Sequence, residues 1–366
     1  MYLTISLSLI AGLVLLVVGA EFLVRGAARI AIMFNISPLI IGLTIVAFGT
    51  STPEMAVSTQ SAWVGQGDLA IGNIIGSNIF NVLFILGVSA LITPLIVSRQ
   101  LIRLDVPVMI AASILAWVLA MDGSYSRLDG FILFACVVIY TSYLILSSLR
   151  KYKLGKLSVE DSEYSEQINT GRFTIVKNLA FILAGLALLL LGSKLLVSGA
   201  VDLAKLLGLS ELVIGLTVLA IGTSLPELAT SLIAAWKGER DIAVGNIVGS
   251  NIFNLLCVLG LAALVSPEAI TVDPNALSFD YPVMLAVTIA CLPIFFAGYR
   301  ISRWNGALFF FYYIAYTSYL VMHSQGHDLA QSLSDAMLGY VAPLTGISLF
   351  VIAFRAYHKQ PSLPER

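Results

Sequence analysis

The sequence predicts an all-α polytopic membrane protein made of two five-helix repeats of inverted topology, with an eleventh transmembrane helix after them. Three observations lead to this fold class. Of 366 residues, 58% are hydrophobic and 11% are charged, and apolar segments approach the roughly 20 residues that a helix needs to cross a bilayer. The sequence also repeats itself, and each copy holds an odd number of apolar spans. An odd number requires the second copy to enter the membrane from the opposite face.

The repeat aligns Leu13–Gly87 with Leu186–Gly260 without a gap, at a constant offset of 173 positions. The run GNIIGSNIFN, which begins at Gly72, returns as GNIVGSNIFN from Gly245. Chance does not place the same polar and helix-breaking residues twice in register, so the chain is an internal duplication.

Each copy contains five apolar spans. In the first copy, 1–149, we expect spans at about 3–25, 38–64, 69–97, 104–122 and 128–149. A hydrophilic loop, 150–172, leads to the second copy, 173–322, with spans at about 173–201, 211–236, 241–265, 279–298 and 304–322. The last part, 323–366, holds an outer loop, the eleventh span at about 336–354 and a tail. The first span lacks the basic n-region of a cleaved signal peptide, so we expect it to remain in the mature protein.

Basic residues near the span ends predict the orientation, because cytoplasmic loops carry an excess of Lys and Arg. With the N-terminus outside, seventeen basic residues lie at the inner ends, and only Arg127 and Lys205 lie at the outer side. The loop 150–172 and the C-terminus are then cytoplasmic. We expect a multi-pass protein of the inner, cytoplasmic membrane that contacts lipid. A formal net charge of −1 gives no indication of a nucleic-acid partner.

The second span carries polar residues where lipid-facing helix would be apolar. Ala47, Thr50, Ser51 and Glu54 are spaced i, i+3, i+4, i+7, which places two hydroxyls and a carboxylate on one helix face. Pro53 has no N–H to continue the helix, so it opens the helix there and frees main-chain oxygens.

The other copy and the neighbouring spans add matching oxygen atoms. The seventh span repeats the set as Ala220, Thr223, Ser224 and Glu227, and the third and eighth spans add the matched pairs Ser77 with Asn81 and Ser250 with Asn254. A buried carboxylate needs a partner, and Lys194, the one basic residue at comparable depth, lies nearer the outer end. A cation is the remaining candidate. Carboxylate, hydroxyl, amide and carbonyl oxygens suit Ca²⁺ and Na⁺, whereas the lack of His and thiolate here argues against zinc or copper.

At the paired G-T-S-x-P-E and G-N-x-x-G-S-N-I-F-N motifs the chain resembles the prokaryotic sodium/calcium exchangers of the calcium:cation antiporter superfamily, over about residues 1–322. The resemblance implies a ten-helix core in which spans 2, 3, 7 and 8 surround the ions while spans 1 and 6 slide across them. It implies these ion ligands: Ala47 and Ala220 through their carbonyls, and Thr50, Ser51, Glu54, Ser77, Asn81, Thr223, Ser224, Glu227, Ser250 and Asn254.

The chain departs from the family pattern in two respects. Some relatives carry Asp where this chain has Asn254, and the eleventh span lies outside the family core. The resemblance links potassium-coupled relatives to that Asp and suggests three Na⁺ per Ca²⁺. We therefore expect an electrogenic, potassium-independent antiporter of Na⁺ and Ca²⁺, without cofactors and without enzymatic activity.

Three other functions compete with this one. A proton-driven antiporter of Ca²⁺ or another cation would use Glu54 and Glu227 as proton carriers. A passive cation channel would use a similar oxygen cage, but it does not explain an inverted repeat with broken helices. An intramembrane hydrolase would use the glutamates as acid and base, but the sequence lacks a nucleophile–base arrangement.

Overall fold

The structure is a computed structural model that describes residues 2–34, 36–153, 172–206, 220–327 and 329–358. The beginning of the expected span at 211–236 and most of the loop 150–172 lie outside the described residues. The described chain is mainly helical, as the composition predicts, and its few strands are two residues long.

The first repeat combines α-helices, short π-helical segments (η) and two short strands. In chain order these are α1 (Tyr2–Met33), α2 (Pro38–Ile41), η1 (Gly42–Val46), α3 (Ala47–Thr50), α4 (Thr52–Trp63), α5 (Gly67–Phe80), η2 (Asn81–Leu86), α6 (Gly87–Ile92), β1 (Leu95–Ile96), η3 (Leu101–Asp105), α7 (Val106–Ala120), β2 (Ser124–Tyr125) and α8 (Arg127–Lys153).

From Ala220 onward, the second repeat has the same kinds of element in the same order as the first repeat has from Ala47 onward, and three elements of the C-terminal part follow it. In chain order these are α9 (Arg172–Leu206), α11 (Ala220–Gly222), α12 (Leu225–Trp236), α13 (Arg240–Phe253), η5 (Asn254–Val258), α14 (Leu259–Val265), β3 (Ile270–Thr271), η6 (Ala276–Asp280), α15 (Tyr281–Phe296), β4 (Arg300–Ile301), α16 (Arg303–Ser324), α17 (Leu329–Ala336), η7 (Met337–Val341) and α18 (Ala342–His358).

In the described part of the chain, seven helices are long and apolar enough to cross a membrane, or eight if the bent pair Pro38–Thr50 and Thr52–Trp63 forms one span. The expected tenth span forms the helix α16, which is less apolar because it carries four tyrosines. The expected eleventh span is also helical, as η7 and α18. All-α polytopic architecture is thus confirmed.

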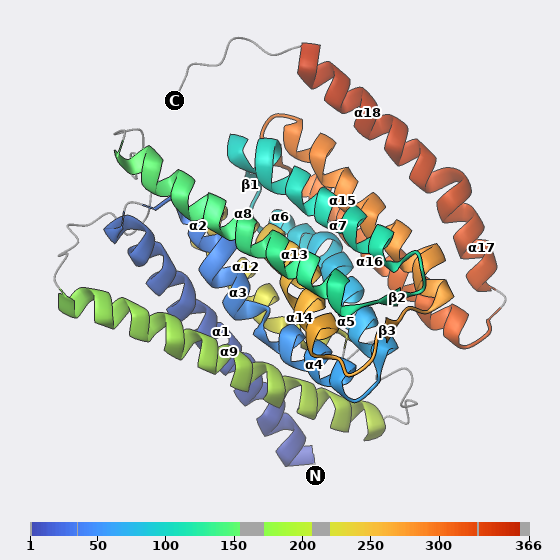
Figure 1. Cartoon of the computed structure of the whole chain (residues 1–366), viewed down its shortest axis with the longest axis horizontal. Coiled ribbons are helices and arrows are strands. Elements are labelled where there is room, and N and C mark those ends of the chain that lie inside the picture. Colours follow the sequence, from blue (N-terminus) through green and yellow to red (C-terminus); the bar gives the residue numbers. More distant parts are fainter. Residues whose placement is uncertain (1, 35, 154–171, 207–219, 328, 359–366) are drawn as a thin grey trace.

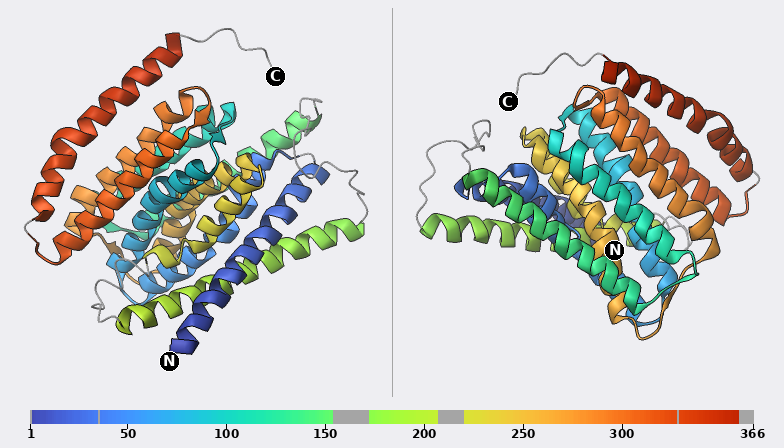
Figure 2. Two further views of the ribbon diagram at one scale, coloured as in Figure 1. Left: turned by 180° about the vertical axis from the view of Figure 1, so that it is seen from behind. Right: turned by 45° about the horizontal axis from the view of Figure 1, so that its top comes forward.

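The first helices of the two repeats run antiparallel along one edge of the bundle (Figures 1 and 2). Their glycines show how closely the two backbones approach: a Cβ at Gly12 would lie 2.7 Å from Leu196 N, and a Cβ at Gly19 would lie 2.8 Å from Leu189 N. As the residue numbers rise along α1, those of the contacting residues in α9 fall, so the two helices run in opposite directions. Equivalent helices that run in opposite directions are what a pseudo-two-fold axis in the membrane plane produces.

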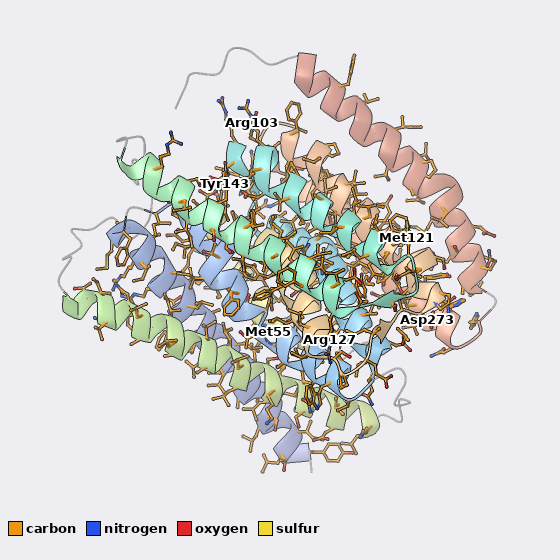
Figure 3. All side chains as sticks on the ribbon, in the orientation of Figure 1. Met55, Arg103, Met121, Arg127, Tyr143 and Asp273 are labelled. Atoms are coloured by element: carbon orange, nitrogen blue, oxygen red, sulfur yellow. The ribbon has the colours of Figure 1, made fainter. Side chains whose placement is uncertain are left out.

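Two small antiparallel sheets join the repeats at opposite ends of the bundle. β1 pairs with β4, and β2 pairs with β3, so each sheet takes one strand from each repeat. Figure 3 shows Arg103, which follows β1, near one end of the bundle, and Arg127 and Asp273, which follow β2 and β3, near the other. The loop after the third span of each repeat thus meets the loop after the fourth span of the other repeat, which inverted topology requires.

The most buried helices lie in the middle of the bundle and carry the polar motifs. The most apolar windows of Gly67–Ile92 and Arg240–Val265 are 78% and 89% buried. α7, α8, α15 and α16 flank this centre, while α18 lies at the edge opposite to α1 and α9 (Figure 1). This arrangement places the matched motifs of the two repeats against each other, away from lipid.

Candidate cation site

Two matched helix breaks position the polar residues. The second span bends by 46° between α3 and α4, where Ser51 has φ −77° and ψ 7°. The seventh span breaks in the same way between α11 and α12, where Ser224 has φ −90° and ψ 9°. Proline is the second residue of the following helix in both copies, and it cannot donate the backbone bond that would continue the preceding helix.

The breaks bring two glutamates into the centre of the bundle. Glu54 and Glu227 are both 0% exposed. Ser224 Oγ donates to Glu54 Oε1 at 2.6 Å, and Ser51 Oγ donates to Glu227 Oε1 at 3.1 Å. Ser77 Oγ also donates to Glu54 Oε1, at 3.5 Å, and lies 3.1 Å from Ser224 Oγ. Each carboxylate is therefore held by a serine of the other repeat.

Several oxygen atoms at this place have no donor. Within the described residues, no hydrogen-bond partner reaches Glu54 Oε2, Glu227 Oε2, Asn81 Oδ1 or either side-chain polar atom of Asn254. Among the described side chains, no Lys or Arg forms an ion pair with either glutamate. Since an unpaired buried carboxylate is costly, these carboxylate oxygens need either a cation or a proton.

Two asparagines that the sequence interpretation did not single out hold the threonines. Thr50 Oγ1 donates to Asn246 Oδ1 at 3.1 Å, and Thr223 Oγ1 donates to Asn73 Oδ1 at 3.0 Å. The Asn246 amide in turn donates to Ser231 Oγ at 2.9 Å, as the Asn73 amide does to a serine of α4 at 3.0 Å. Both asparagines occupy matched positions in the G-N-x-x-G-S-N motif. This match is the sequence feature from which their role could have been predicted.

Four further predicted residues, Ala47, Ser250, Asn81 and Asn254, are buried on the same spans. Ala47 O accepts a bond from Thr50 Oγ1 at 3.3 Å, and Ser250 Oγ lies 3.5 Å from that hydroxyl. Asn81 Nδ2 donates to the side chain of Asn251 at 3.0 Å. Asn254 is fully buried and begins η5, one turn after Ser250.

Ala220 is the first residue of α11, four residues before Ser224, and its side chain lies outside what the structure describes. We refer to the twelve residues predicted from the sequence as the cation site. Two of the twelve residues carry carboxylates, and the other ten offer hydroxyl, amide or carbonyl oxygens. Among the described residues, no three or more His, Cys, Asp or Glu side chains lie close enough together to hold a metal ion by themselves.

Comparisons with known proteins identify the family of the chain. The profile of the family described as "Sodium/calcium exchanger protein" matches residues 5–146 and 177–322. The chain is 42% identical to the putative antiporter CaxA of Alkalimonas amylolytica over 338 residues, which cover 87% of this chain and 99% of that protein. It is 43% identical to the inner membrane protein YrbG of Escherichia coli (strain K12) over 285 residues, which cover 77% of this chain and 85% of that protein.

A solved structure extends the likeness to the fold. The sodium-calcium exchanger NCX_Mj, soaked with zero Na⁺ and Ca²⁺, superimposes with a TM-score of 0.74 at 32% sequence identity, covering 87% of this chain and 100% of that chain.

Proposed function

Since the chain belongs to the sodium/calcium exchanger family, we propose that it exchanges Na⁺ for Ca²⁺ across the membrane by alternating access. Members of this family are transporters, so the chain is a cation antiporter and not an enzyme. The proposal goes further in naming Na⁺ as the counter-ion, in a net movement of charge and in independence from K⁺. It involves no covalent step and no cofactor.

The observation that supports this proposal most is the pair of buried glutamates, each of which accepts a hydrogen bond from a serine of the other repeat. Glu54 and Glu227 are 0% exposed, and each keeps one carboxylate oxygen without a described donor. Two ionised carboxylates carry the charge that one Ca²⁺ balances. The surrounding oxygens are hard ligands, which favour Ca²⁺ and Na⁺ over softer metals.

We assign the ions to the twelve residues of the cation site. The carboxylates are the charged ligands, and the serine, threonine and asparagine oxygens complete the shell. The proposed ligands are Ala47, Thr50, Ser51, Glu54, Ser77, Asn81, Ala220, Thr223, Ser224, Glu227, Ser250 and Asn254.

The proposal assigns alternating access of the ions to a sliding movement of the helices α1 and α9. Glycines at seven-residue spacing in both helices, Gly12 and Gly19 in α1 and Gly185 and Gly192 in α9, leave no side chain between the two backbones. α1 packs against α12, and α9 packs against α11. A sliding movement of α1 and α9 would therefore pass along the broken seventh span. A passive channel does not need helices that slide to open the site to one side of the membrane at a time.

The proposed location is the inner membrane, with the N-terminus outside and the C-terminus in the cytoplasm. The excess of basic residues at one end of the bundle supports this orientation. The similarity to a relative named as an inner membrane protein supports the location.

Ca²⁺ uptake into vesicles that contain the purified protein tests the function directly. With Na⁺ inside and none outside, we expect rapid ⁴⁵Ca²⁺ uptake that stops when the Na⁺ gradient is removed. Uptake that follows the Ca²⁺ gradient alone would indicate a channel and contradict antiport.

A proton-driven antiporter is the second candidate, because the free oxygens Glu54 Oε2 and Glu227 Oε2 could each carry a proton. The same vesicles separate the two. An outward proton gradient without Na⁺ should leave uptake at background, and uptake driven by that gradient alone would replace Na⁺ with H⁺ in the proposal.

A further inference from the structure

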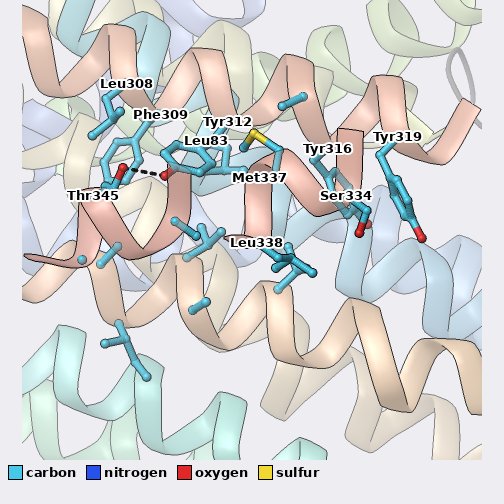
Figure 4. A pocket seen from close by; sticks show the side chains of 18 of the residues that line it. Leu83, Leu308, Phe309, Tyr312, Tyr316, Tyr319, Ser334, Met337, Leu338 and Thr345 are labelled. Atoms are coloured by element: carbon cyan, nitrogen blue, oxygen red, sulfur yellow. Dashed lines mark hydrogen bonds between the residues drawn. The ribbon is translucent and has the colours of Figure 1, made fainter. Parts of the chain in front are cut away.

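A cavity of about 640 Å³ lies between the helices of the C-terminal part and the helices α15 and α16. Its walls come from α15, α16 and the α17–η7–α18 segment (Figure 4). It lies outside both polar motifs of the repeat, so antiport does not account for it.

The cavity is long and narrow. On α15 and the turn before it, lining residues run from Phe279 to Ile294, a distance of about 22 Å at roughly 1.5 Å per residue. Spread over this length, the volume is that of an elongated space, which suits a linear hydrocarbon chain better than a compact ligand.

A hydrogen bond between two lining residues ties α18 to α16. Tyr312 Oη on α16 donates to Thr345 Oγ1 on α18 at 2.7 Å, and it also lies 3.3 Å from Val341 O (Figure 4). The bond holds α18 at a set distance from α16. Most other lining side chains are apolar, among them Val287, Leu308 and Met337, so water would find few partners there.

The two ends of the cavity differ in polarity. At the end near α17, the hydroxyl-bearing side chains of Tyr319 and Ser334 lie together with Tyr316, whose own hydroxyl donates to Asp280 at 3.1 Å (Figure 4). At the other end, the lining consists of residues such as Pro293 and Gly346. Leu338, also in the lining, is 63% exposed, so the cavity has an open side toward the surroundings of the bundle.

We propose that this cavity binds one acyl chain of a membrane phospholipid, with the glycerol and headgroup beside Tyr319 and Ser334. The cavity opens sideways on helices that the membrane surrounds, where hydrocarbon chains are the abundant linear apolar ligand. Its length exceeds half of the roughly 30 Å hydrocarbon core, which is the reach of one chain in a leaflet. Tyrosine at the polar end suits the membrane–water interface.

Filling the cavity tests the proposal. A Cβ at Gly346 would meet no described atom within 4 Å, so Gly346→Trp can be accommodated and its ring would take the place of lipid methylenes. Gly339→Trp is the matched control, since Gly339 has the same open surroundings in η7 but does not line the cavity. Ala286→Trp fills the cavity from the opposite wall and guards against a local defect of Gly346→Trp.

Each variant is reconstituted in vesicles of palmitoyl-oleoyl phosphatidylethanolamine and phosphatidylglycerol, re-extracted in detergent and examined by native mass spectrometry. We expect wild type and Gly339→Trp to retain one phospholipid per chain. Gly346→Trp and Ala286→Trp should retain about tenfold less, because displacing as few as two buried methylenes has an effect of that size. Monodisperse elution in size-exclusion chromatography confirms that each variant is folded.

Equal retention by all four proteins would overturn the proposal, as would a wild type that retains no lipid. A wild-type dimer that Gly346→Trp dissociates would also overturn it, by assigning this face to a second copy of the chain.

Discussion

Ser51 and Ser224 show how the duplicated residues work at the residue scale. Each serine shares a helix face with the glutamate of its own repeat, yet each donates its hydroxyl to the glutamate of the other repeat. A serine side chain has one proton to donate, so this bond leaves its oxygen lone pairs for another partner. The two halves of the cation site are therefore completed across the pseudo-two-fold axis.

Glu54→Gln and Glu227→Gln should each abolish Ca²⁺ exchange while the protein remains folded. Glutamine removes half of the negative charge that balances Ca²⁺, and a lost bond to a charged group costs up to about 3 kcal/mol, roughly 100-fold in affinity. ⁴⁵Ca²⁺ uptake measures the loss. Glu268→Gln, an exposed glutamate in the turn before β3, is the control and should behave as wild type. Wild-type exchange by both site variants would refute the assignment.

Asn246 should act as a positioning residue for Thr50. By accepting the Thr50 hydroxyl at 3.1 Å, it turns the oxygen lone pairs of Thr50 toward the site. Asn246→Leu removes this acceptor, and the loss of a bond worth about 1 kcal/mol should raise the KM for Ca²⁺ by roughly fivefold to tenfold, with a smaller effect on the maximal rate. Uptake measured over a range of Ca²⁺ concentrations separates the two parameters.

The conservative variants distinguish positioning from packing. Asn246→Asp keeps the acceptor and should restore much of the affinity, and Ser231→Ala, which removes only the partner of the amide nitrogen at 2.9 Å, should be milder than Asn246→Leu. An Asp variant no better than the Leu variant would leave Asn246 with a packing role alone.

At the scale of elements, helix irregularities coincide with the site in both repeats. π-helical segments begin at Asn81 and at Asn254, directly after α5 and α13. π-helical turns are rare and occur often at functional positions, because the wider turn shifts the side chains out of the regular register. Together with the breaks at Ser51 and Ser224, they give each of the four motif-bearing spans an irregular helix segment.

Gly185→Leu should disturb the α1/α9 pair. A Cβ at Gly185 would lie 2.6 Å from Leu23 N, and a backbone atom cannot move aside as a side chain can. Overpacking of this kind costs about 1–3 kcal/mol, so we expect a lower melting temperature and exchange at least about tenfold slower. Gly339→Leu, where a Cβ meets no described atom within 4 Å, is the control. Unchanged transport by Gly185→Leu would show that this interface tolerates separation.

At the scale of the whole molecule, the charges of the site predict an electrogenic cycle. With both glutamates ionised the empty site carries −2, so Ca²⁺ makes it neutral and three Na⁺ make it +1; Asn81 and Asn254 add no charge. A tenfold Na⁺ gradient is worth about 1.4 kcal/mol per ion, and one charge across 100 mV about 2.3 kcal/mol, together roughly 6.5 kcal/mol. That would sustain a Ca²⁺ ratio above about 10⁴.

Vesicles with an imposed membrane potential in potassium-free buffer measure this charge movement. Ca²⁺ uptake in exchange for internal Na⁺ should accelerate when the interior is made positive, because each cycle carries one net positive charge outward. Exchange that ignored voltage, or that needed added K⁺, would contradict the stoichiometry.

The orientation of the molecule gives a separate prediction. Trp304, which is 85% exposed at the start of α16, should face the cytoplasm, and the exposed Glu268 should face outward. An impermeant thiol reagent applied to intact cells should therefore label Glu268→Cys and not Trp304→Cys. The reverse labelling pattern would show that the protein has the opposite orientation in the membrane.

Span ends show where sequence pattern and structure part. The first span was expected at 3–25, but α1 continues to Met33, because a helix can extend past the apolar segment when charged residues such as Arg25 and Arg29 lie at the membrane surface. The third span was expected to reach residue 97, but its last helix ends at Ile92, before Pro94, since the residue that precedes a proline is disfavoured in helical conformation.

The sequence by itself determined the duplication, the apolar spans and the matched glutamates and hydroxyl residues, because these are local or periodic properties of one chain. Tertiary structure decided which partners meet: that Ser51 reaches Glu227, that Asn246 holds Thr50, and that an elongated cavity lies beside α18. The first two contacts join residues of different repeats. Their distances depend on how helices cross and pack, and no spacing along a single helix contains that information.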